Sequence, residues 1–283
     1  MIIFAVSMSK YNYRNMKYTV TDWIEDLQKD GRVCFSLAET IAKFPSYREI
    51  VLRNALTRLV SKKKICSVWQ GFYVIIPIEY QSKGIIPEVY YIDWLMKFLG
   101  RNYYVSLLNA AAFYGAAHQQ PQEFTVVTTP PSLRSTQKKG TKINFNNKAT
   151  IPEELTEQRK TPTGYIRISS PELTATDLIQ FEKEIGGINR AATVLNELAE
   201  NCNFNKLTKE FFQYVPAPII QRLGYLLDEV LECQSQANDL YSVIKKYDIS
   251  FRKTLLKIRK TTANCEENKK WKIIINEQID IDE

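Results

Sequence analysis

The sequence predicts an α+β protein with an N-terminal winged helix-turn-helix domain, followed by a larger, mostly helical α+β domain with a small sheet. Two closely spaced helix-start signals lie near residue 40, and a basic run and a β-rich hairpin follow them directly. Amphipathic helical patterns dominate the rest of the chain. Prolines and a polar run at residues 77–87 break the pattern, so we expect the domains at residues 1–80 and 85–283.

The composition is that of a globular protein, because 45% of the 283 residues are hydrophobic and 24% are charged. The net charge is +7, with an excess of five positive charges in residues 1–80, four in residues 81–160 and a deficit of two in the rest. The positive charge over the first domain suits a polyanionic partner such as nucleic acid. The five cysteines are widely spaced and form no C-x-x-C pair. This pattern argues against a disulfide framework and a structural zinc site, and it fits a reducing cytoplasm.

The first eight residues, MIIFAVSM, are apolar but too short for a secretory signal, and no basic residue precedes them. No run approaches the ~20 apolar residues that a membrane helix needs. We therefore expect no signal peptide and no membrane partner, with Met8 and Met16 as alternative translation starts.

The N-terminal domain begins with a helix expected over residues 19–29, which places Trp23 in the core. The second helix begins at a capping box, in which the Ser36 hydroxyl caps the helix start and Glu39 reaches back to the capping residue. The proline that follows Phe44 ends this helix, because a proline disfavours helical geometry at the residue before it.

A second capping box, formed by Ser46 and Glu49, is expected to begin the helix over residues 47–60. Its apolar stripe of Leu52, Ala55, Leu56 and Leu59 must face the core. On the opposite face asparagine can pair with adenine, arginine with guanine, and a methyl group can touch thymine.

A lysine run suited to phosphates follows this helix, and residues 65–76 read as a hairpin wing with a glycine at its bend. The predicted DNA contacts are Tyr47, Arg48, Ile50, Arg53, Asn54, Thr57, Arg58, Lys62, Lys63, Lys64, Trp69 and Gln70. Capping boxes and charge runs also occur on solvated faces, but the order helix, turn, helix, basic run, hairpin favours DNA binding. Trp69 at the wing tip could equally be buried.

The second domain is expected to begin with an amphipathic helix over residues 90–99, whose apolar stripe is Tyr91, Trp94, Leu95 and Phe98, and an alanine-rich helix after Gly100. Strands are predicted over residues 123–128, 142–145 and 165–169. A basic tract in this region is either exposed loop or a charged contact surface; it consists of Arg134, Lys138, Lys139, Lys142 and Lys148.

The last third of the chain is predicted to be mainly helical. Ser170 caps a helix with Pro171 in its first turn, and this helix stops at two glycines, residues 186 and 187. Further helices are expected over residues 189–199, 207–212, 219–231 and 240–247, with a late strand over residues 271–275.

We expect no cofactor and no catalytic site. His118 is the only histidine, and such a residue more often caps a helix end than catalyses or binds a metal. Asp280 and Asp282 could suggest a magnesium-binding pair, but they lie where fraying and solvation are expected. No P-loop, G-x-G-x-x-G, G-x-S-x-G or H-E-x-x-H motif occurs.

Three stretches resemble one family: YYVSLLNAAAFYGAAHQQPQEFTVVT from residue 103, SSPELTATDLIQFEKEIGGINRAATVLNEL from residue 169, and the closing WKIIINEQIDID. They look like the antitoxins of type IV AbiE toxin–antitoxin systems, the AbiEi family. The resemblance implies a bacterial abortive-infection (phage defence) module whose toxin is a separate nucleotidyltransferase-like protein. It also implies a transcriptional repressor that binds double-stranded promoter DNA with inverted repeats through its N-terminal domain, while the C-terminal domain neutralises the toxin without a stable complex.

Two alternatives remain open from the residues alone. The chain could be a plain winged-helix transcriptional regulator, or an enzyme whose C-terminal domain acts on the toxin or on a nucleotide. A convergent set of nucleophile, base and phosphate cradle would favour an enzyme, and the sequence contains none. If the resemblance holds, the basic tract is a candidate toxin-neutralising surface.

Overall fold

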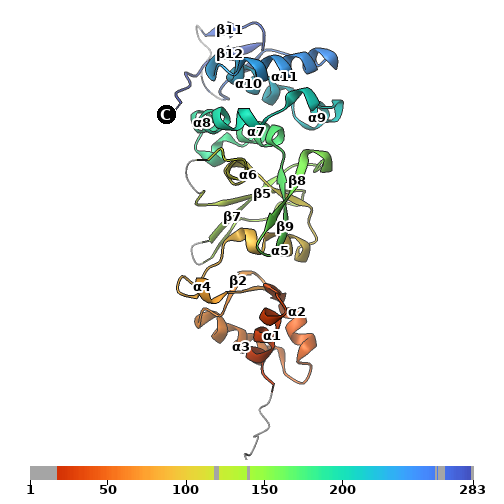
Figure 1. Ribbon diagram of the computed structural model, residues 1–283, viewed down its shortest axis with the longest axis vertical. Helices are drawn as coiled ribbons and strands as arrows, with labels where there is room; N and C mark the ends of the chain where they lie inside the picture. The colour runs from red at the N-terminus through yellow and green to blue at the C-terminus, as the bar shows by residue number, and fades with distance from the viewer. Residues whose placement is uncertain (1–17, 118–120, 139–140, 259, 261–264, 282–283) are drawn as a thin grey trace, which may run out of the picture. The chain divides into compact units, whose positions relative to one another are not determined.

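The computed structural model describes residues 18–117, 121–138, 141–258, 260 and 265–281, and the chain divides into two compact units at Gly84 and Ile85 (Figure 1). The secondary structure is mixed α+β throughout. Among the described residues, no helix has the length and apolar character needed to cross a bilayer.

The first unit contains three helices and a three-stranded antiparallel sheet with strand order β1-β3-β2. In chain order its elements are α1 (Val20–Lys29), β1 (Cys34–Ser36), α2 (Leu37–Lys43), α3 (Glu49–Ser61), β2 (Ile65–Trp69), β3 (Phe72–Ile75) and the short α4 (Ile78–Gln81). Helix α1 ends at Lys29 as predicted, and α2 ends at Lys43, directly before the Phe44-Pro45 pair predicted to end it. Trp23 is buried as expected. Strand β1 was not predicted, because its three residues carry no alternation and end directly at a helix cap.

The capping box at the start of α2 is confirmed. The Glu39 amide donates to the Ser36 hydroxyl at 3.0 Å, and the Ser36 amide donates to the Glu39 carboxylate at 2.7 Å. Arg32 also donates to this carboxylate, at 2.6 Å. Burial alone would raise the pKa of Glu39, but the hydrogen bonds from Arg32 and Ser36 lower it below its ordinary value.

The second unit is built on a six-stranded mixed sheet with strand order β6-β7-β5-β4-β9-β8 (Figure 1). Its strands are β4 (Tyr103–Val105), β5 (Phe124–Thr128), β6 (Thr136–Lys138), β7 (Thr141–Asn147), β8 (Thr156–Thr161) and β9 (Gly164–Ser169). The pairs β4–β9 and β5–β7 are parallel, and the others are antiparallel. Strands β5, β7 and β9 are the three predicted ones. The other three are short or polar, and the sequence did not indicate them.

The largest apolar cluster joins Tyr104 and Val127 of the sheet to helices from residue 107 onward. The helices of this unit follow in chain order. They are η1 (Glu88–Tyr90), α5 (Ile92–Phe98), α6 (Leu107–Phe113), η2 (Glu153–Leu155), α7 (Pro171–Gln180), η3 (Glu182–Ile185), α8 (Ile188–Leu198), η4 (Ala199–Asn201), η5 (Phe204–Lys206), α9 (Lys209–Tyr214), α10 (Ala217–Tyr225), the π-helical η6 (Leu226–Val230) and α11 (Gln234–Lys246). The Ser170 side chain caps α7 as predicted, accepting from the Leu173 amide at 3.2 Å.

The expected apolar stripe of the helix near residue 95 is partly wrong. Trp94 and Phe98 are 44% and 43% exposed, whereas Ile92, Leu95 and Met96 are fully buried. The buried set has the helical spacing i, i+3, i+4, so the aliphatic side chains of α5 face the core and its aromatic rings face outward.

The second unit also contains a small sheet with strand order β10-β12-β11; its strands are β10 (Thr254–Leu255), β11 (Glu266–Asn268) and β12 (Ile273–Ile275). Just before β12, the fully buried Trp271 donates its indole N–H to Asp228 at 2.8 Å. Its ring lies against Gly224 of α10, where a Cβ would fall 2.0 Å from the Trp271 Cζ3 atom. Only glycine fits at that position without displacing the indole.

Candidate functional site

Helix α3 positions most of the side chains predicted to contact DNA. Its inward stripe is confirmed, since Leu52, Leu56 and Leu59 are buried, and α1 and α2 pack against it. The opposite face is exposed and carries Ile50, Arg53, Asn54, Thr57 and Arg58. The exposed set contains side chains able to pair with bases and a methyl-bearing residue able to touch thymine.

The start of α3 differs from the expectation. The Ser46–Glu49 capping box does not form: the helix begins at Glu49, with Arg48 as a capping residue that makes no side-chain cap. Glu49 instead pairs with Arg53 one turn on, at 2.6 Å. Tyr47 therefore precedes the helix, and its ring is half-buried at 6.1 Å from that of Phe44.

Two of the three lysines after α3 have partners within the chain. Lys63 donates to the Ser82 carbonyl at 2.7 Å, and Lys64 pairs with Glu25 at 3.0 Å, while Lys62 is exposed. The Lys64–Glu25 pair is itself open to solvent, and such pairs contribute only about 0–1 kcal/mol. A phosphate group could displace it at little cost.

The predicted wing is the hairpin of β2 and β3. The register shifts between Ser67 and Trp69, and Gly71 takes a positive φ of 75° at the bend. The Gly71 carbonyl accepts from the Leu37 amide at 2.8 Å, which ties the bend to the start of α2. Trp69 is half-buried and Gln70 is exposed, so the tip offers part of an indole ring and an amide.

The basic tract of the second unit does not form one surface. Arg134 and Lys138 are exposed, whereas Lys142 pairs with Glu123 at 2.7 Å. Lys148 is only 7% exposed, which removes it from any contact surface. Lys139 lies outside the described residues, as do His118 and Asp282.

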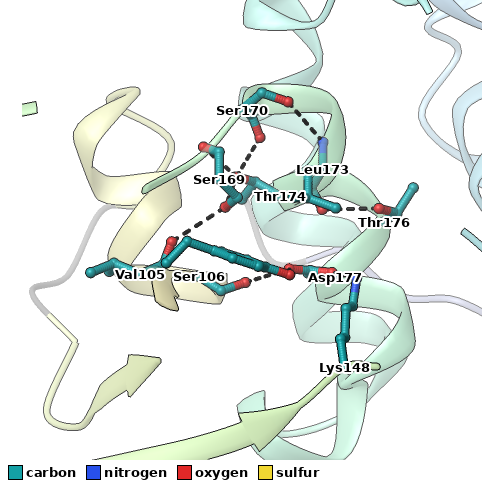
Figure 2. Close-up of polar contacts among 10 residues, drawn as sticks. Val105, Ser106, Lys148, Ser169, Ser170, Leu173, Thr174, Thr176 and Asp177 are labelled. Atoms are coloured by element: carbon teal, nitrogen blue, oxygen red, sulfur yellow. Dashed lines mark hydrogen bonds and ion pairs between the residues drawn. The ribbon is translucent and has the colours of Figure 1, made fainter. Parts of the chain in front are cut away.

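Lys148 belongs to a buried polar centre around Asp177, which the sequence did not predict (Figure 2). One carboxylate oxygen of Asp177 accepts from the Tyr104 hydroxyl at 2.9 Å and from the Ser106 hydroxyl at 2.7 Å. The other oxygen pairs with the Lys148 ammonium group. The Lys148 nitrogen also lies 4.7 Å from the centre of the Tyr214 ring.

This centre joins four elements: Tyr104 comes from β4, Ser106 directly precedes α6, Lys148 follows β7, and Asp177 lies on α7. Asp177 lies 29 to 73 residues from Tyr104, Ser106 and Lys148 in sequence, so no local spacing could reveal the centre. The only local signal is a helix with polar residues on its buried side, in the run Thr174, Thr176 and Asp177.

The centre is closed to solvent, because Tyr104, Ser106 and Asp177 are fully buried. Burial and the neighbouring Asp177 carboxylate raise the pKa of Tyr104 well above its ordinary value, so its hydroxyl stays a donor. The Ser106 hydroxyl donates to a carboxylate and has no route to a substrate. The arrangement therefore holds elements together and offers no open catalytic site.

The described residues contain no group of three or more histidine, cysteine or carboxylate side chains able to hold a metal ion. Within the same ranges, no disulfide joins any of the cysteines. Burial raises the pKa of the Cys34 thiol to about 12, which leaves it unreactive at neutral pH.

Comparisons with known proteins assign the middle of the chain to a family. Residues 104–229 match the model of the AbiEi antitoxin C-terminal domain, a range that includes every residue of the Asp177 centre. No curated protein matches the chain. The crystal structure of the RV2827C protein from Mycobacterium tuberculosis has the same fold, with a TM-score of 0.64 at 14% sequence identity over 90% of each chain.

Proposed function

The chain belongs to the AbiEi antitoxin family through its domain at residues 104–229, and on this basis we propose that it is a DNA-binding antitoxin of a type IV toxin–antitoxin system. In this proposal it represses its own operon by binding inverted repeats in promoter DNA. It also counteracts a nucleotidyltransferase-like toxin in the bacterial cytoplasm, as part of abortive infection. The family match is the observation that supports the antitoxin role over a plain regulator or an enzyme.

The DNA-binding half of the proposal is supported by the exposed face of α3. Arg58 and Asn54 have no side-chain ion pair or hydrogen bond within the described part of the chain, so both can turn toward base edges without breaking a contact. Lys62 follows directly, and the wing tip at Trp69 and Gln70 provides a second contact. The element order of the first unit, with a strand between the first two helices and a hairpin after the third, suits a winged helix-turn-helix.

A gel-shift titration with the DNA upstream of the gene tests this half. Arg58→Ala should weaken binding by roughly 1–3 kcal/mol and relax the sequence preference, because arginine reads a guanine edge. Lys62→Ala should weaken binding to all DNA sequences about equally and make the affinity less dependent on salt, because a lysine contacts phosphate. If both variants bind the DNA as tightly as the parent protein, α3 does not contact the operator.

The toxin-directed half is proposed to use exposed basic side chains of the second unit. Of the predicted tract, Arg134 and Lys138 are available at the surface, and Lys142 sits in a half-exposed pair. A positive surface of this kind could compete for an anionic substrate of the toxin.

Co-expression with the toxin tests this surface. Arg134→Glu with Lys138→Glu should reduce cell survival relative to the parent, and a matched reversal at exposed Lys183 and Lys209 should not. Unchanged survival with the first pair, in protein shown to be folded, would exclude this surface from neutralisation.

A further inference from the structure

A groove of about 470 Å³ lies in the second unit between α5, the turn after it, and the β8–β9 hairpin. This volume is in the range of small-molecule sites, roughly 300–1,000 Å³. The groove is distant in sequence from α3, and the proposed DNA binding does not account for it.

Two aromatic rings that line the groove are unusually open. Trp94 of α5 is 44% exposed and Tyr165 of β9 is 58% exposed. Large aromatic side chains are usually buried in a core, so an exposed pair at one cavity indicates a surface built for a partner with an apolar face.

The groove is also basic, since its described lining residues include Lys97, Arg101 and Arg167 but Asp93 as their only carboxylate. The Lys97 nitrogen lies 2.7 Å from Asp93 and 5.3 Å from the centre of the Trp94 ring. The lysine charge is thus held beside the exposed indole.

The two arginines keep most of their donors for another partner. Arg101 gives one N–H to the Pro130 carbonyl, at 2.9 Å. Arg167 lies 3.5 Å from Glu153, whose side chain is 82% exposed, and such an open pair is weak. A guanidinium group has five N–H donors, so both arginines can still bind a phosphate.

The exposed aromatic rings and the nearby guanidinium groups together suit a ligand that has a flat apolar part and an anionic part. Nucleobases stack on tryptophan and tyrosine, and the attached phosphate pairs with arginine or lysine. We propose that this groove binds a nucleotide, with the base packed against both Trp94 and Tyr165 and the phosphate held by Arg101 and Arg167. The nucleotide is either free in solution or an unpaired nucleotide of an RNA strand.

Isothermal titration calorimetry on the full chain tests the proposal, with ATP, GTP, CTP, UTP and short homopolymeric RNAs as ligands. Trp94→Ala and Tyr165→Ala should each weaken binding by about 5- to 150-fold, the usual effect of removing one stacking ring. Arg167→Ala should weaken it as well. Tyr165→Phe keeps the ring and should bind like the parent.

Phe98→Ala is the matched control, because this ring is on the same helix and 43% exposed but does not line the groove. Lys209→Ala is the second control: this lysine is exposed and does not line the groove, so nucleotide binding should stay intact. Binding of free nucleotides identifies a mononucleotide site, and binding of RNA alone identifies a strand site. Lack of binding by every ligand, or equal losses in Phe98→Ala and Trp94→Ala, would overturn the proposal.

Discussion

Asp177 depends on one cation, Lys148, for charge compensation among the described residues of the interior. Lys148→Met removes that cation and leaves the carboxylate buried at 0% exposure, with two hydroxyl donors but no positive charge. Breaking a buried pair in this way typically costs about 3–5 kcal/mol. We expect a loss of this size in the free energy of unfolding, measured by urea denaturation.

Lys142→Met is the matched control at the residue scale. Lys142 pairs with Glu123 in the same sheet region, but the two side chains are 38% and 44% exposed. Solvent screens such a pair, so its loss should cost about 0–1 kcal/mol. Equal destabilisation by the two lysine variants would contradict a special role for the buried centre.

At the scale of the element, two of the three serines predicted to cap helices, Ser36 and Ser46, make different contacts. Ser36 accepts from the Glu39 amide at 3.0 Å, whereas α3 begins without any side-chain cap from Ser46. Ser36→Ala should therefore destabilise the first unit by roughly 1 kcal/mol, and Ser46→Ala should change its stability by less than about 0.5 kcal/mol. Thermal unfolding followed by circular dichroism measures both, and a larger loss at Ser46 would place the start of α3 earlier than residue 49.

This pair shows what local sequence can predict. The capping rule needs a serine at the right distance from a helix start, and the sequence matches it at both Ser36 and Ser46. At Ser46 the match is not realised, because α3, which packs against α1 and α2, begins only at Glu49. Helices and the longer apolar strands could therefore be predicted, while β1 and β4, of three residues each, could not.

The candidate sites also differ in whether local sequence is enough to predict them. The exposed face of α3 could be predicted, because one helix carries it and its periodicity is local. The Asp177 centre and the groove beside Trp94 could not, because each combines residues from elements that are far apart in sequence. The burial of Lys148 was missed for the same reason: nothing in its neighbours distinguishes it from an exposed lysine.

At the scale of the whole molecule, the two units have separate apolar clusters. One extends from Val20 to Ile75, the other begins at Tyr104, and they have no residue in common. A fragment of residues 85–283 should therefore fold by itself, with a cooperative urea transition, and should lose binding to the promoter fragment. A fragment that aggregates or unfolds without cooperativity would show that the units depend on each other.

Because Trp271 packs on Gly224, the two units cannot complete their cores at the same stage of translation. A ribosome makes the first unit early, and that unit contains all the residues of its own apolar cluster. Helix α10 also leaves the ribosome well before the indole that covers it, so the core of the second unit stays open until Trp271 has been translated. Translation that stops before this tryptophan would yield a protein with an intact first unit and an unfinished second one.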